Sequence, residues 1–305
     1  MYKYVKTIIY NNIFMITCNV MGGLGNQLFQ ICTTISYAKK YKLEFVFLYS
    51  EFVGVGKTIR RNTYWNNFLK SLNRYVYTTL PQVSYLKEEG FTYNELPKPI
   101  IGKGKDNNIC LFGYFQSYKY FQDDLVFIKR LLNLTLQKKI VIEKSSYLTE
   151  ELEKTVSIHF RLGDYKLFPD IYPLLTYEYY ENSILFLNEK NINNNDCSFT
   201  FNKVLYFCEE VDNEDVNIII NKLKIKFDNL DFIKVSENLE DWEQLLLMSC
   251  CKYNVIANST FSWWGAYLNE NKNKIVCYPE KWFGEKKSNV DTKDLFLPEW
   301  NKIKI

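Results

Sequence analysis

Apolar and polar residues alternate along the chain in two series, each typical of strands interleaved with helices. The first series opens with a short apolar run at 14–21, which glycines follow and which predicts a buried strand. Apolar residues then recur at helical spacing over 26–40, before a second apolar run at 44–48. This order predicts a β-α-β unit. The pattern is weaker over 51–104 and then predicts a strand at 109–113 and a helix at 119–134.

A second alternating series begins at Thr155 and indicates a parallel sheet with helices on both faces. Polar residues precede it, so we place a boundary within 140–153 and expect two α/β domains, 1–150 and 151–305. Two doubly wound domains facing one another leave a cleft, and ligands of such sheets bind at the carboxyl ends of the strands. The predicted strands are 156–160, 204–208, 232–235, 254–257 and 275–278, and the predicted helices are 177–187, 212–223, 239–250 and 262–269.

Composition excludes several classes of protein. A chain of 305 residues has room for two cores of ordinary size. Its 47% hydrophobic and 24% charged residues argue against disordered, fibrous and membrane-spanning chains. The net charge of +3 is spread out, without a basic block to follow a nucleic-acid backbone. Nucleic acid is therefore not an expected partner.

Cysteine usage and the amino-terminal residues indicate a cytoplasmic protein. The 8 cysteines form no C-x-x-C pair and only one histidine accompanies them, so we expect reduced, structural thiols and no metal cluster. The apolar stretch 8–20 is interrupted by three asparagines and is too short to span a bilayer. It also lacks the design of a signal peptide. Peripheral association with a membrane and the oligomeric state stay open.

The first polar segment that could carry chemistry is M-G-G-L-G-N-Q-L-F-Q, residues 21–30. Gly23 and Gly25 allow a ligand to approach the backbone, and Asn26 and Gln27 are expected to expose amides near a helix start. The other interpretation, a tight turn needed only for packing, is about equally good.

The second segment, S-I-H-F-R-L-G-D-Y, places charged and aromatic residues at the end of a predicted strand. His159 and Arg161 lie on one side of the extended chain, and Arg161 offers a fork of donors suited to a phosphate. Gly163 allows a sharp turn. The alternative is a salt bridge from Arg161 to Asp164 that closes the turn, with His159 as a core residue.

The third segment, N-S-T-F-S-W-W-G-A-Y-L, again follows a predicted strand and begins a helix. Hydroxyls beside unpaired helix N–H groups suit an anion such as a diphosphate. One hydroxyl could equally be an ordinary N-cap, and Trp263 and Trp264 are more often core residues than sugar platforms. The candidate binding residues are Asn258, Ser259, Thr260, Phe261 and Ser262.

Several catalytic motifs are absent from the sequence: a G-x-S-x-G elbow, a Walker motif, an H-E-x-x-H helix and a D-x-D triplet. Without a D-x-D triplet to hold a metal, a nucleotide sugar would need protein groups to neutralise its diphosphate. Arg161 and a helix start are the groups we expect to do so.

Together the segments resemble the bacterial and viral α-1,2-fucosyltransferases of glycosyltransferase family 11. The family pattern H-x-R-R-G-D-Y is similar to residues 159–165, G-G-L-G-N-Q-x-F-Q to 22–30, and N-S-[ST]-F-S-W-W-G-A to the segment from 258. A fourth match, G-Y-F-Q-S-x-K-Y-F, lies at 113–121. The resemblance covers about residues 14–282 in the expected order.

This resemblance implies a glycosyltransferase-B-like fold of two Rossmann-like domains facing a cleft. It implies a GDP-β-L-fucose donor bound mainly by the second domain, with no metal or other cofactor, and the acceptor on the first. L-fucose would move with inversion to a glycan hydroxyl, O2 of a terminal galactose or a similar sugar. Arg161 would contact the donor diphosphate beside His159. Asp164 is our first candidate for the base, and His159 the second.

The sequence departs from the family pattern at three places. Leu162 replaces the second arginine, and Cys208-Glu209-Glu210 replaces S-D-D. Related enzymes hold guanine with an acid where this chain has Gln244, so we favour Asp241 over Glu243 as the nearby substitute. Two alternatives therefore stay open: a transferase for another GDP- or UDP-sugar, and a non-catalytic carbohydrate-binding protein of the same fold.

Overall fold

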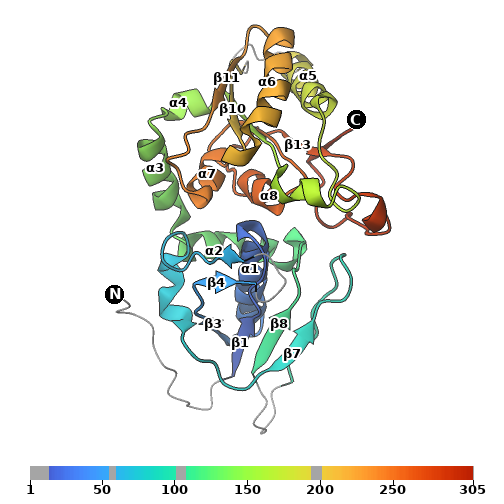
Figure 1. Ribbon diagram of the computed structural model, residues 1–305. Coiled ribbons are helices and arrows are strands. Elements are labelled where there is room, and N and C mark those ends of the chain that lie inside the picture. Colours follow the sequence, from blue (N-terminus) through green and yellow to red (C-terminus); the bar gives the residue numbers. More distant parts are fainter. Residues whose placement is uncertain (1–13, 55–59, 101–107, 194–200, 305) are drawn as a thin grey trace. The chain divides into compact units, whose positions relative to one another are not determined.

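The computed structural model describes residues 14–54, 60–100, 108–193 and 201–304 (Figure 1). The chain divides into two compact units. The N-terminal unit comprises Met1–Gln137 and Asp291–Leu297, and the C-terminal unit comprises Lys138–Val290 and Pro298–Ile305. The chain thus returns to the N-terminal unit shortly before its end.

The N-terminal unit combines short strands with helices, and η denotes a 3-10 helix. Its elements are β1 (Met15–Cys18), α1 (Leu24–Lys40), β2 (Glu44–Phe45), β3 (Phe47–Leu48), β4 (Phe52–Val53), β5 (Arg61–Asn62), η1 (Lys70–Tyr75), β6 (Val76–Tyr77), β7 (Ser84–Lys87), β8 (Ile109–Phe112), η2 (Tyr118–Tyr120), η3 (Gln122–Asp124) and α2 (Leu125–Leu131), and α3 (Leu134–Ser145) runs from it into the C-terminal unit.

A parallel sheet with the order β2-β1-β8-β7 forms the centre of the N-terminal unit. All four residues of β1 are buried, and α1 is buried along most of its length. The predicted strand, glycine turn and helix are therefore confirmed. The expected strand at 44–48 is divided at Val46, because β2 pairs with β1 whereas β3 pairs with β6. The expected helix at 119–134 begins as 3-10 turns and is interrupted at Asn133, whose φ is +52°.

The C-terminal unit contains a longer series of strands and helices. Its elements are α4 (Thr149–Leu152), β9 (Thr155–His159), η4 (Gly163–Leu167), α5 (Tyr177–Asn193), β10 (Lys203–Phe207), η6 (Glu210–Asp212), α6 (Asn213–Lys226), β11 (Asp231–Lys234), α7 (Asp241–Met248), β12 (Tyr253–Val255), α8 (Thr260–Tyr267), β13 (Val276–Pro279), η7 (Glu285–Lys287) and β14 (Asn301–Ile303).

The six strands of this unit form one parallel sheet with the order β11-β10-β9-β12-β13-β14. In chain order this is 3-2-1-4-5-6, the strand order of the Rossmann fold. The α/β class predicted for this half is confirmed, and all five predicted strands and four predicted helices are present. Their ends shift by a few residues at most, except that α5 continues from the predicted end at 187 to Asn193.

The two faces of the sheet have different surroundings. Val156 and Ile158 of β9 belong to a hydrophobic core that includes residues of α5 and α6. Side chains alternate along a strand, so Ser157 and His159 point to the other face. There Asn254 of β12 donates to the Ser157 hydroxyl at 2.7 Å and to the carbonyl of Met248, the last residue of α7, at 2.8 Å. His159 therefore ends β9 on the face covered by α7 and α8.

The order of the strands reverses between β9 and β12. The chain proceeds from β9 to β10 and β11 on one side and then returns to β12 on the other. At such a reversal the loops leave the two central strands in opposite directions, and a crevice remains outside their carboxyl ends. The segments that begin at Arg161 and at Asn258 follow these two strands.

Helix α3 explains why the units divide after Gln137, ahead of the stretch 140–153 in which we expected the boundary. The Lys138 ammonium donates to the Leu268 carbonyl at 2.6 Å, and the Lys144 ammonium lies 2.6 Å from the Glu243 carboxylate. Most of this polar helix therefore packs on the C-terminal unit.

Asp294 binds the returning segment to the N-terminal unit. Its carbonyl accepts from the Ser117 hydroxyl at 2.7 Å, and its carboxylate lies 2.5 Å from the Lys119 ammonium and 3.0 Å from the Tyr93 amide nitrogen. Three partners far away in sequence thus hold this segment.

Lys144→Ala should lower the free energy of unfolding by about 2 kcal/mol, because it leaves the buried Glu243 carboxylate without its cation. Lys139→Ala on the same helix is the matched control, since Lys139 is 73% exposed and lies 3.9 Å from Glu143. Urea unfolding of both variants measures the difference, and equal effects would contradict the role given to Lys144.

Candidate functional site

Arg161 lies two residues beyond β9, and its side chain is only 16% exposed. Its guanidinium forms ion pairs with Asp164 and with Glu209, and it lies 5.1 Å from the centre of the Tyr165 ring. The salt bridge to Asp164 that the sequence offered as an alternative is thus present. Glu209 follows β10 and was not predicted as a partner.

The loop after Arg161 is held by a second acidic residue, Asp212. The backbone N–H of Gly163 donates to the Asp212 carboxylate at 2.7 Å, and the Lys166 ammonium lies 2.8 Å from the same group. Asp212 is buried, so these partners compensate its charge. Gly163 has φ +31°, in the region that favours glycine, which accounts for its place in this turn.

Tyr165 joins the loops after β9 and β12. Its hydroxyl donates to the Asn258 carbonyl at 3.0 Å, and its ring stacks on Tyr172 at 4.5 Å between centroids. Burial raises the pKa of Tyr165 to about 12, so the hydroxyl keeps its proton and remains a donor at neutral pH. The segments containing Arg161 and Asn258, which are far apart in sequence, therefore lie in one region.

The side chains at the start of α8 mostly stabilise the turn itself. Ser259 is the N-cap and accepts from the Phe261 amide at 3.3 Å. The Asn258 amide donates to the Pro173 and Trp282 carbonyls at 2.9 and 3.3 Å, and the buried Ser262 hydroxyl lies 3.4 Å from the Ser259 carbonyl.

This arrangement corrects part of the sequence-based site. The Asn258 amide nitrogen and the Ser262 hydroxyl, which we expected to face a ligand, contact backbone carbonyls instead. Trp263 and Trp264 are 0% and 1% exposed, so the packing interpretation of these rings is confirmed.

His159 is a neutral, buried imidazole. It is 7% exposed, its ring centroid lies 5.3 Å from that of Phe261, and within the described part of the chain its Nδ1 has no hydrogen-bond partner. Burial, and then the charge of Arg161, lower its pKa from 6.5 to about 3. So weak a base is poorly suited to take a proton at neutral pH, which argues against our second candidate for the base.

The glycine turn of the N-terminal unit is mainly structural. Gln27 was expected to expose its amide, but it is fully buried and donates to the Gly22 and Asn62 carbonyls at 2.9 and 2.8 Å. The side-chain Oδ1 of Asn26 accepts a hydrogen bond from the Gln116 side-chain amide at 2.9 Å.

Gly23 has the most open surroundings of the candidate residues in this turn. It is the N-cap of α1, and no atom outside its chain neighbours and its own helix lies within 4 Å of where a Cβ would be. Gly25, by contrast, is buried within α1. Gly23 therefore offers more room for an approaching ligand than Gly25 or Gln27 does.

The three candidates for holding the guanine of a donor lie in the first turn of α7, and their surroundings differ. Glu243 is buried against Lys144 and accepts from the Glu240 amide at 2.7 Å, while the Gln244 amide donates to the Leu239 carbonyl at 3.0 Å. Asp241 is exposed and accepts from the Trp242 amide at 2.7 Å. Asp241 is therefore the most exposed of the three candidates, and of the two carboxylates it is the one that solvent reaches.

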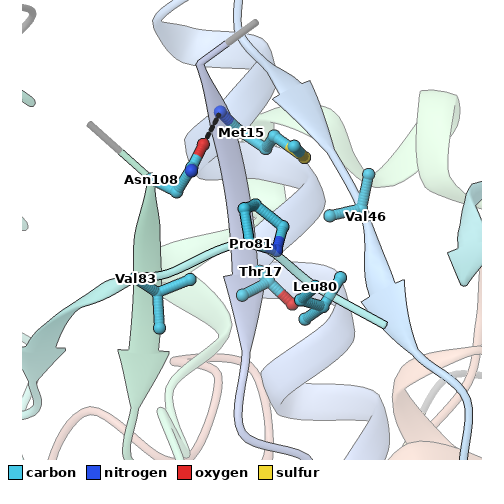
Figure 2. Close-up of a pocket in the computed structure, with 7 residues that line it drawn as sticks. All are labelled: Met15, Thr17, Val46, Leu80, Pro81, Val83 and Asn108. Carbon is cyan, nitrogen blue, oxygen red and sulfur yellow. Dashed lines mark hydrogen bonds between the residues drawn. The ribbon is translucent and has the colours of Figure 1, made fainter. Parts of the chain in front are cut away.

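Figure 2 shows a small pocket in the N-terminal unit that is unrelated to these segments. Its wall is largely apolar, and on one side the Met15 backbone N–H donates to the side-chain Oδ1 of Asn108 at 3.1 Å. It contains none of the predicted site residues. The lining residues are Met15, Thr17, Val46, Leu80, Pro81, Val83 and Asn108.

Two features are absent from the part of the chain that the structure describes. Among its residues, no group of three or more His, Cys, Asp or Glu side chains is arranged to hold a metal ion. None of the helices within that part of the chain is both long and apolar enough to cross a membrane.

The family model for glycosyl transferase family 11 matches residues 2–304. The chain belongs to this family. It is therefore a glycosyltransferase, and the alternative of a non-catalytic carbohydrate-binding protein is set aside.

Three relatives each match at least 90% of this chain. The O-antigen biosynthesis glycosyltransferase WbnK of Escherichia coli is 27% identical, over 90% of this chain and 97% of that protein. An α-1,2-colitosyltransferase of Escherichia coli is 28% identical, over 90% of this chain and 94% of that protein. A galactoside 2-α-L-fucosyltransferase of Caenorhabditis elegans is 22% identical, over 95% of this chain and 79% of that protein. The names of two of these relatives thus refer to different transferred sugars, colitose and fucose.

The pKa of His159 predicts a specific dependence of stability on pH. Between pH 6.5 and about 3 the unfolded chain binds a proton that the folded chain does not, so stability falls as the pH falls. From pH 7 to pH 5 this contribution amounts to about 2 kcal/mol.

Urea unfolding of the parent and of His159→Asn at both pH values measures this contribution. Because His159 is the chain's one histidine, the parent should lose about 2 kcal/mol more than the variant over this range. Equal losses would show that the folded protein protonates His159.

Proposed function

We propose that this glycosyltransferase transfers L-fucose from GDP-β-L-fucose, with inversion, to O2 of a terminal galactose or a similar sugar of a glycan. Membership of family 11 and the relative named galactoside 2-α-L-fucosyltransferase support the reaction type and the linkage. In this proposal the C-terminal unit binds the donor and the N-terminal unit binds the acceptor.

The observation that carries the proposal is the juxtaposition of Arg161 with the amino end of α8. Both follow the two strands at which the sheet order reverses, and the hydrogen bond from Tyr165 to the Asn258 carbonyl joins their loops. A guanidinium provides N–H donors, and a helix amino terminus attracts negative charge. Two such groups, at the carboxyl ends of the neighbouring strands β9 and β12, suit a diphosphate.

Arg161 would act mainly on the leaving group. When the bond from fucose to the diphosphate breaks, negative charge grows on GDP, and donors already directed at that charge lower the barrier. Asp164 pairs with the guanidinium and would orient it. In this proposal its first role is to position Arg161, and the role of catalytic base is secondary. Neutral His159 would form the adjoining wall without adding charge.

One further group would belong to the donor site in this proposal. Asp241, which is exposed, would accept a hydrogen bond from guanine. In the N-terminal unit, Gly23 has the room to let a sugar approach its backbone. Arg161 and the amino end of α8 would neutralise the diphosphate, so the reaction would need no metal ion.

Incubation with GDP-fucose, simple galactosides and excess EDTA tests this reaction directly. We expect GDP release together with a fucosylated product whose NMR spectrum shows an α-1,2 linkage. Absence of transfer with EDTA but recovery with Mg²⁺ would refute the metal-independent mechanism.

A second candidate donor follows from the relative named α-1,2-colitosyltransferase, which matches over 90% of this chain. Arg161 and the amino end of α8 would also accept another nucleotide sugar, because contacts to the diphosphate do not select the sugar. Parallel incubations with GDP-colitose, other GDP-sugars and UDP-sugars, scored by nucleotide release, distinguish these donors. Faster release from one of them would replace GDP-fucose in the proposal.

Arg161→Ala should lower turnover by a factor of about a hundred or more, since it removes stabilisation of the departing diphosphate. Lys234→Ala is a matched control, because it removes a cation at the end of β11 in the same sheet, where Lys234 pairs with Glu237. The control should retain turnover close to that of the parent. Normal turnover by a folded Arg161→Ala variant would exclude the role.

A further inference from the structure

The contacts of Arg161 bear on how tightly the donor binds. Its two terminal nitrogens pair with different carboxylates, one with Asp164 and the other with Glu209. A phosphate that binds a guanidinium through two parallel N–H groups needs donors on the same edge. The two carboxylates therefore compete with a phosphate for Arg161.

The charge around Arg161 is unfavourable to an anion. The ion pairs here connect two cations with four carboxylates, so the surroundings of the proposed diphosphate site carry excess negative charge. The cations are Arg161 and Lys166, and the carboxylates belong to Asp164, Glu209, Asp212 and Asp215.

Three of these carboxylates either bind other groups of the protein or lie on the same loop as Arg161. Asp212 is buried beneath Gly163, Asp215 pairs with Lys166, and Asp164 is three residues from Arg161. Glu209 lies in the loop after another strand, β10, and its side chain is 50% exposed. Glu209 can thus move into solvent without unfolding the loop.

The turn at Gly163 leaves room for the Glu209 carboxylate. A Cβ at this position would lie 3.1 Å from one Glu209 oxygen, tighter than an ordinary contact. The carboxylate therefore lies over the turn that follows Arg161. It occupies space next to the guanidinium that a phosphate bound there would also need.

We propose that Glu209 is an affinity-determining residue of the donor site, which occupies Arg161 in the absence of donor and must be displaced by the diphosphate. This rests on the proposed function, in which Arg161 binds that diphosphate. Glu209 thereby weakens the binding of both GDP-fucose and the GDP product. A weaker hold on GDP favours its release after transfer.

Calorimetric titration with GDP tests the proposal. Glu209→Gln should bind GDP at least about threefold more tightly than the parent, because the variant loses the competing charge. Glu210→Gln removes the same charge from the next, exposed residue and is the matched control, which should stay within about twofold of the parent. Unchanged or weaker binding by Glu209→Gln would overturn the proposal.

Two further variants separate this inference from the proposed function. Arg161→Ala should bind GDP at least tenfold more weakly, and adding Glu209→Gln to it should recover less affinity than Glu209→Gln gains in the parent. Parent-like GDP binding by Arg161→Ala would reject the diphosphate role itself. An equal gain in both backgrounds would show that Glu209 acts through general charge and not through Arg161.

Discussion

The parallel pairing of β9 with β10 on one side and with β12 on the other is the constraint on which the candidate site depends. Each pairing brings a carboxyl end, and the loop that follows it, next to the end of β9. Arg161 consequently meets Glu209 from one neighbour, and its loop meets Asn258 from the other. Neither contact could form if the order of these three strands were different.

Charge compensation around Arg161 is the second organising feature. A guanidinium that is largely withdrawn from solvent needs partners, and the chain supplies two carboxylates. The same pairing that keeps the arginine in place also opposes an anionic ligand. Binding and release of a nucleotide diphosphate would therefore depend on competition for Arg161 between the diphosphate and the two carboxylates.

Many motif residues that suggested ligand contacts instead stabilise turns. Gln27 binds two backbone carbonyls beneath the glycine turn, Ser259 caps α8, and Asn258 connects its loop to two others. Buried amides and hydroxyls need such partners, because unsatisfied polar groups are costly inside a protein. A motif of this kind thus contains both the groups that shape a site and the smaller number that face a ligand.

The sequence by itself determined the alternation of strands and helices in the C-terminal unit, the placement of polar segments after β9 and β12, and the family. Hydrophobic periodicity and glycine turns are local properties, so they are visible without a structure. The tertiary structure alone decided which groups meet. Glu209 is 48 residues from Arg161, and Lys144 is 99 residues from Glu243. Partners so distant are chosen by strand order and register, and no local pattern encodes those.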